Sequence, residues 1–158
     1  MKYIKLELGN DTRYIADRCS YSFAREGGDN GALSTLGFFL TDDVHYSKDS
    51  IERWISLINS FSDDDSTESN YSFIEKDNGT IILGCQFDLF DDKVDFEQAY
   101  ERAYANALRF KPQQLIDILN QWYELCSRKV QYIIITQDDE NNFTITGKDF
   151  PDSPNSDN

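Results

Sequence analysis

The residues best able to do chemistry gather in one short stretch, FDLFDDKVDFE, at positions 87–97. This stretch has a single lysine, and its five carboxylates are Asp88, Asp91, Asp92, Asp95 and Glu97. Carboxylates at this density could coordinate a metal ion, act as acid and base in hydrolysis, or form a surface for a positively charged partner. Each of these chemistries makes its own demand on the neighbouring sequence.

Metal and cofactor motifs are missing from the sequence. A calcium loop of the EF-hand type needs glycine at its sixth position and glutamate at its twelfth, and frames starting at Asp63 or Asp88 have neither. The glycine-rich stretch at 26–31, EGGDNG, matches no nucleotide-binding pattern. The three cysteines form no C-x-x-C pair, so we interpret them as small buried hydrophobic residues. The sequence therefore predicts no metal ion and no cofactor.

His45 is the one histidine in the chain. A histidine that acts as a general base needs a nucleophile and an orienting acid close to it. Acids stand beside it in TDDVHYS, but no motif brings a nucleophile to it from among Ser34, Ser47 and Cys19. We interpret His45 as an ordinary residue before a helix, and a hydrolase with an unrecognised carboxylate site remains an alternative.

The charge of the chain is strongly acidic, with 29 acids, 15 bases and a formal net charge of −14. Residues 61–101 hold 12 of the acids and two of the bases, so this segment alone contributes about −10. Such a surface repels nucleic acid and anionic membranes and attracts basic proteins. The N-terminus alternates polar and apolar residues, and no apolar run is long enough to span a membrane, so we expect a cytoplasmic protein.

The pattern of the chain predicts one α+β domain over residues 1–150, with a mainly antiparallel sheet and about three helices packed on it. Helices are predicted from Ser47, from Asp95 and from Pro112, because each position suits a helix start and an amphipathic stripe follows it. The stripe after Asp95 alternates alanine with aromatic residues as far as Leu108.

The predicted strands surround these helices. They comprise a first strand at 3–8, an extended segment at 12–23, a buried strand STLGFFL at 34–40, a hairpin over 71–90 that turns at Asn78-Gly79, and a closing hairpin over 130–147. Gly84 is expected to mark a bulge or a close approach to the backbone. Residues 62–70 are expected to form a solvated loop, and 151–158 a disordered acidic tail.

The function predicted from these features is binding of a basic protein. Aromatic residues interleave with the acids of residues 87–97, and at least one of Leu89 and Phe90 must face away from the core. The predicted contact residues are Asp63, Asp64, Asp65, Glu68, Asp88, Phe90, Asp91 and Asp92.

The chain resembles small acidic bacterial immunity proteins, which neutralise a cognate toxin in contact-dependent growth inhibition and other polymorphic toxin systems. The resemblance is carried by the length, the SDDDSTESN and FDLFDDKVDFE segments, and the lack of a catalytic motif. It implies a protein that performs no chemistry and blocks the active site of a basic toxin domain such as a nuclease. The alternatives are a DNA-mimic inhibitor, the hydrolase mentioned above, and an adaptor or structural subunit.

Overall fold

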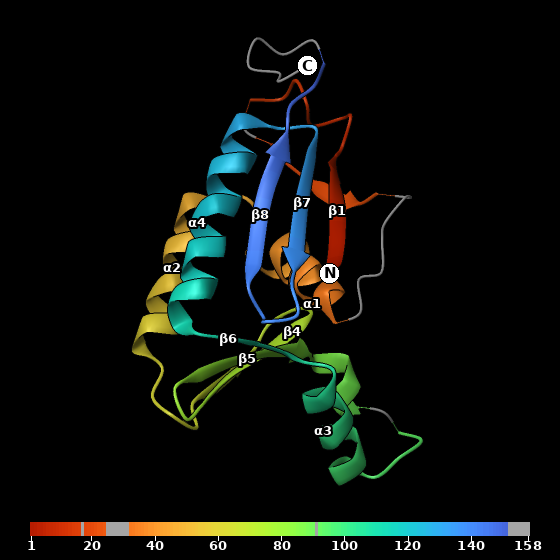
Figure 1. Ribbon diagram of the computed structural model, residues 1–158, viewed down its shortest axis with the longest axis vertical. Coiled ribbons are helices and arrows are strands. Elements are labelled where there is room, and N and C mark those ends of the chain that lie inside the picture. Colours follow the sequence, from red (N-terminus) through yellow and green to blue (C-terminus); the bar gives the residue numbers. More distant parts are fainter. Residues whose placement is uncertain (17, 25–31, 91, 152–158) are drawn as a thin grey trace.

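Two antiparallel sheets of four strands each form the frame of the structure (Figure 1). The computed structural model describes residues 1–16, 18–24, 32–90 and 92–151. Sheet A has the order β2-β1-β7-β8, with β1 at Lys2–Leu8, β2 at Tyr21–Phe23, β7 at Tyr132–Gln137 and β8 at Phe143–Lys148. Sheet B has the order β3-β4-β5-β6, with β3 at Ser66–Glu68, β4 at Ser72–Asp77, β5 at Thr80–Cys85 and β6 at Leu108–Phe110.

Four α-helices are present among the described residues: α1 at Leu33–Phe38, α2 at Lys48–Ser60, α3 at Phe96–Ala105 and α4 at Pro112–Arg128. A π-helix, η1 at Phe39–Val44, continues α1, and a 3₁₀ helix, η2 at Gln86–Phe90, follows β5. The predicted α+β class is therefore confirmed, although the strands divide into two sheets. None of these helices combines the length and apolar composition that crossing a membrane requires.

The three predicted helix starts agree with the structure. The Ser47 side chain accepts a hydrogen bond from the Ser50 amide at 3.0 Å, and the Asp95 side chain accepts one from the Gln98 amide at 2.9 Å. Pro112 occupies the first turn of α4. A backbone N–H at this position would have no acceptor within the helix, so the absence of one in proline costs no hydrogen bond. Each helix thus begins where a local side chain satisfies or removes a free backbone donor.

One hydrophobic core joins the two sheets. Inward-facing residues of β1, β4, β5 and β7 belong to the same buried cluster, together with apolar residues of α1, α2 and α4. Figure 1 shows α2 and α4 side by side along sheet A, and α3 on the far side of sheet B from them. The outer face of sheet B therefore lies outside the main core, and α3 is the element that covers part of it.

The prediction of a strand at STLGFFL was wrong, because residues 33–44 are helical. A short apolar run fits a buried helix as well as a buried strand, and this helix is buried on most sides. At Gly37, a Cβ atom would lie 2.6 Å from the Phe23 ring and 2.8 Å from Ile4 Cδ1. The close packing of α1 against β1 and β2 thus depends on a residue without a side chain.

Other boundaries also differ from the prediction. Among the described residues of the segment 12–23, the strand is limited to Tyr21–Phe23, and residues 10–14 form turns. The loop 62–70 contains β3, the second arm of the 71–90 hairpin ends at Cys85, and Leu108 begins β6 rather than ending a helix. The glycine-rich stretch 26–31, Asp91 and residues 152–158 of the predicted tail lie outside the described residues.

A second, smaller hydrophobic cluster lies between α3 and the outer face of sheet B. Its buried members are Phe73, Ile82, Ala103 and Ala107, and Leu89 and Tyr104 pack against them. Ala99 and Ala103 are 0% exposed, so α3 approaches the sheet closely through its alanines. This approach decides which side chains of α3 remain at the surface.

Candidate protein-binding surface

The aromatic residues of α3 lie largely outside the small cluster that its alanines form. Phe96 is 69% exposed and Tyr100 is 41% exposed. The sequence placed alanines and aromatic residues in one stripe, and the structure separates them, with the alanines buried and Phe96 and Tyr100 at the surface. Because the alanines bring the helix backbone near the sheet, the larger rings have space only at its sides.

Rings of α3 and β4 form a continuous row. The ring centroids of Phe96 and Tyr100 are 6.0 Å apart, those of Tyr100 and Tyr104 are 4.4 Å apart, and those of Tyr104 and Phe73 are 5.7 Å apart. The Tyr100 hydroxyl donates a hydrogen bond to the Tyr104 hydroxyl at 2.9 Å. The row therefore extends from the buried Phe73 to the exposed Phe96, and its mutual contacts hold the exposed rings in place.

Carboxylates lie beside this row of rings. Burial raises the pKa of the Glu75 carboxyl above its ordinary value, and the negative charges of Asp77 and Asp64 raise it further. Burial also raises the pKa of the Tyr100 hydroxyl, with smaller contributions from Glu75 and Asp77. Glu75 and Asp77 follow Phe73 at two-residue spacing on β4, so they lie on the face of sheet B that α3 partly covers.

The exposed end of the row is hollowed. Phe96, Glu97, Tyr100 and Glu101 line a depression of about 440 Å³. Two aromatic rings and two carboxylates at one place form a suitable environment for a cationic side chain, because aromatic faces and carboxylates both attract positive charge.

Two of the predicted contact residues hold the loop before β3, Asp63 by joining it to the β4–β5 turn and Asp65 by a bond within the loop. The Asp63 side chain accepts a hydrogen bond from the Gly79 amide at 2.9 Å, and the Asp65 side chain accepts one from the Ser62 amide at 2.8 Å. Asp64 lies at the same end of sheet B, where its amide donates to the Lys76 carbonyl. These aspartates are exposed, so a structural role and a binding role are compatible.

The other predicted residues lie on β3 and around η2. Glu68 pairs with Phe73 across β3 and β4. Phe90 is 66% exposed, whereas Leu89 packs on the small cluster beneath α3. Asp88 is half-buried and Asp92 is exposed. The outward orientation expected for one of Leu89 and Phe90 is thus adopted by Phe90.

An aromatic cluster that the sequence did not indicate lies at the start of η2 and includes Tyr71, Phe38 and Phe87. The Tyr71 ring stacks on Phe38 at 4.7 Å and meets the Phe87 ring edge at 6.1 Å. Burial raises the pKa of the Tyr71 hydroxyl most, and Asp88 and Asp42 contribute. Phe87 is itself 61% exposed, so this end of sheet B also presents a ring beside carboxylates.

Asp63–Asp65 and η2 lie at opposite ends of the β4–β5 hairpin, and β3 runs back along β4 so that Glu68 lies nearer η2. Asp63 contacts the turn at Gly79, while η2 begins after Cys85, whose partner in register is Ser72. Strands of this length separate the two ends by about 17 Å. The residues between them are those that the sequence did not single out, namely Glu75, Asp77, Tyr100 and Tyr104. We call this whole region the acidic aromatic surface, and its members are Asp63, Asp64, Asp65, Glu68, Glu75, Asp77, Phe87, Asp88, Phe90, Asp92, Phe96, Glu97, Tyr100, Glu101 and Tyr104.

The region around His45 offers a second depression, of about 360 Å³, lined in part by Asp43, His45 and Arg53. The Asp43 carboxylate accepts hydrogen bonds from the amides of Tyr71 and Ser72 at 2.8 and 3.0 Å, so its contacts there fix η1 to β4. Ser47, a candidate nucleophile, uses its hydroxyl oxygen as the cap of α2. Of the candidate nucleophiles, Ser47 thus caps α2, and the Cys19 thiol bonds to the end of α4.

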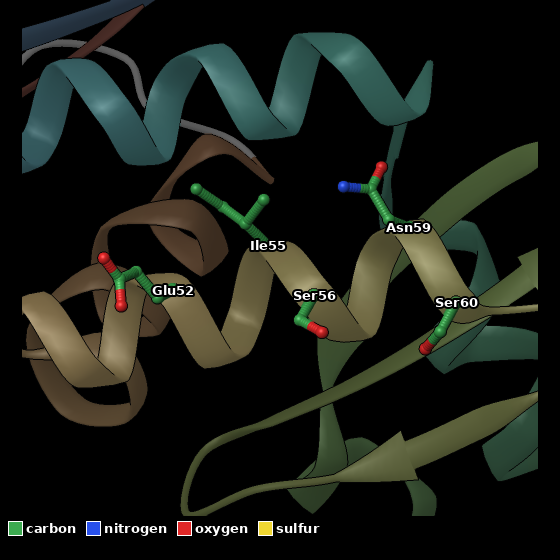
Figure 2. Close-up of a pocket in the computed structure, with 5 residues that line it drawn as sticks. All are labelled: Glu52, Ile55, Ser56, Asn59 and Ser60. Carbon is green, nitrogen blue, oxygen red and sulfur yellow. The ribbon is translucent and has the colours of Figure 1, made fainter.

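A third depression lies on the exposed side of α2. Figure 2 shows its lining residues, all from one helix, with Ile55 and Asn59 directed toward α4. Glu52 is the one ionisable residue that lines it. Among the described residues, no group of three or more His, Cys, Asp or Glu side chains is placed so that it could hold a metal ion.

Comparisons with protein-family models, with curated proteins and with solved structures found no match for this chain. The functional interpretation therefore depends on the physical character of the surface.

Proposed function

We propose that this chain is an immunity-type inhibitor that binds a basic toxin domain, such as a nuclease, through the acidic aromatic surface. The observation that supports it best is the exposure of Phe87, Phe90 and Phe96, at 61–69%, among carboxylates of α3, η2 and sheet B. Single exposed apolar residues need no explanation, but several large rings around one helix indicate an interaction site.

The composition of this surface fits a tight protein–protein interface. Aromatic side chains supply a large contact area at a small entropic cost, and they are frequent among the residues that dominate binding energy. Surrounding carboxylates increase the rate of encounter with a positively charged partner. Nucleases are basic because their substrate is a polyanion, so they match this surface in charge.

In the proposed mechanism, the chain carries out no reaction. Arginine and lysine side chains of the toxin lie over Tyr100 and Phe96 and pair with Glu97 and Glu101. The bound inhibitor then covers the path by which nucleic acid reaches the toxin's active site. We place this event in the cytoplasm. A DNA mimic has less support, because the carboxylates concentrate around one helix and one hairpin instead of following a long regular line.

The test uses the C-terminal domain of a secreted toxin encoded beside the gene for this chain. We expect the two proteins to co-purify and the toxin's activity to disappear at equimolar inhibitor. The variant Glu97→Lys/Glu101→Lys should slow association by about 10- to 100-fold at low salt, with a smaller difference at high salt.

Glu7→Lys/Asp117→Lys is the matched control. It changes the net charge by the same amount as the first double variant, but on sheet A and α4, away from the acidic aromatic surface. Tyr100→Ala should accelerate dissociation, since it removes a ring from the centre of the surface. Equal association rates for both double variants would contradict the assigned surface. Failure of every neighbouring toxin domain to bind would contradict the function.

A further inference from the structure

Cys19 and Cys126 are distant in sequence and adjacent in the fold. Cys126 lies in the last turn of α4 and is 0% exposed, and Cys19 precedes β2 and is half-buried against the same core. The Cys19 thiol donates a hydrogen bond to the Cys126 carbonyl at 3.6 Å. Cys85 lies on sheet B, where its thiol interacts with the Tyr71 hydroxyl.

Several contacts fix the segment around Cys19 to the end of α4. The Tyr21 hydroxyl donates to the Val130 carbonyl at 2.6 Å, and the Tyr21 ring packs on Trp122 at 5.6 Å. The Lys129 ammonium donates to the carbonyls of Thr12, at 2.8 Å, and Ile15. The proximity of the thiols is thus part of the folded structure and does not depend on one contact.

We propose that Cys19 and Cys126 form an intramolecular disulfide when the protein meets a disulfide oxidant such as glutathione disulfide, and that Cys85 takes no part. This thiol pair is a modification site that is independent of the proposed function. It joins sheet A to α4, whereas the acidic aromatic surface lies on sheet B and α3.

The two thiols differ in reactivity. The side chain of Cys126 lowers the pKa of the Cys19 thiol most, burial opposes this shift, and the charge of Lys129 lowers the pKa as well. Burial raises the pKa of the Cys126 thiol. Cys19 is also the more exposed of the two, so its thiolate is the nucleophile that attacks first.

The reaction takes place in two exchange steps. The Cys19 thiolate attacks one sulfur of glutathione disulfide, which forms a mixed disulfide and releases one glutathione thiolate. Cys126 then loses its proton to solvent and attacks the Cys19 sulfur, which releases the second glutathione. In total, two protein thiols are oxidised and one glutathione disulfide is reduced to two glutathione molecules.

The test is thiol counting by mass spectrometry. Reduced protein is incubated with glutathione disulfide, denatured, alkylated with N-ethylmaleimide and digested. We expect the wild type to lose two of its three alkylated thiols and to yield a linked peptide pair that contains Cys19 and Cys126. The oxidised protein should also unfold at a higher urea concentration than the reduced one, because the bond closes a loop of 107 positions.

Three variants make the result specific. Cys85→Ser should form the disulfide as the wild type does, and Cys19→Ser should keep both remaining thiols alkylatable and show no oxidant-dependent change in its urea midpoint. Cys126→Ala checks the second partner and should stop at the mixed disulfide on Cys19. Full alkylation of all three wild-type thiols after oxidation, or a linked pair that includes Cys85, would overturn the proposal.

Discussion

The ring of Phe73 lies across the backbone of Gly84 on the neighbouring strand of sheet B. These residues are partners in the β4–β5 register, and a Cβ atom at position 84 would lie 2.3 Å from two ring carbons of Phe73. The close approach expected at Gly84 is therefore present, and what approaches is an aromatic ring. Phe73 then begins the row of rings that leads through Tyr104 to the exposed side of α3.

Gly84→Ala is expected to destabilise the protein by about 1–3 kcal/mol, because the added methyl group overpacks the small cluster beneath α3. Chemical denaturation measures this change. Phe73→Leu removes the ring, so the double variant Phe73→Leu/Gly84→Ala should be more stable than the sum of the single effects predicts. Strict additivity of the two changes would show that the ring and residue 84 do not meet.

Asp43→Asn is expected to destabilise the protein by about 1–3 kcal/mol. The carboxylate accepts two backbone hydrogen bonds in a buried position, and an amide side chain can accept only through its one oxygen, which leaves one N–H without a partner. The matched control is the exposed neighbour Asp42→Asn, for which a change within about 0.5 kcal/mol is expected. Urea denaturation compares the two, and equal effects would refute a specific role for Asp43.

His45 has φ 57° and ψ −161°, a backbone conformation that favours glycine. His45→Gly should therefore stabilise the protein by about 1 kcal/mol. The variant gains because the backbone strain is relieved, and it loses part of this gain because glycine has more conformational freedom in the unfolded chain. The hydrogen bond that the Trp122 indole N–H donates to the backbone carbonyl of residue 45, 3.0 Å long, is kept in this variant. His45→Ala retains the strain and serves as the control. Thermal denaturation should rank the glycine variant as the most stable of the three, and a glycine variant less stable than the wild type would contradict the strain.

Glu75 should make stability depend on pH. Its folded-state pKa lies above the ordinary value of 4.5, so the folded protein binds the proton more tightly than the unfolded chain. Stability should then fall as the pH rises from about 4.5 through the folded-state pKa. Glu75→Gln should gain stability relative to the wild type over this window, and the difference should be smallest below it.

A second measurement tests the cause of this shift. Asp77 is one of the neighbours that raise the Glu75 pKa, so Asp77→Asn should lower it. NMR titration of the Glu75 carboxyl carbon reports the value directly. A Glu75 pKa at or below the ordinary carboxyl value in the wild type would contradict the arrangement of acids on β4.

Sequence reasoning succeeded for features that a few neighbouring residues determine. The turn at Asn78-Gly79 has positive φ at both residues, as a type I′ turn requires. The helix caps at Ser47 and Asp95 each accept a hydrogen bond from an amide three residues later. It failed for residues 33–44, where a short apolar run is compatible with either helix or strand. The deciding contacts there, around Gly37, come from β1 and β2.

The sequence by itself determined the excess of negative charge, the α+β class and the helix starts and hairpin turn, because these depend on composition and on contacts within a few residues. The tertiary structure alone decided that α3 packs through its alanines, so that Phe96 and Tyr100 face outward beside the acids of β4. It also brought Cys19 to Cys126, and it set Asp63 at the opposite end of one hairpin from η2. Each of these facts depends on how closely elements distant in the chain approach one another, and steric fit between side chains determines that distance.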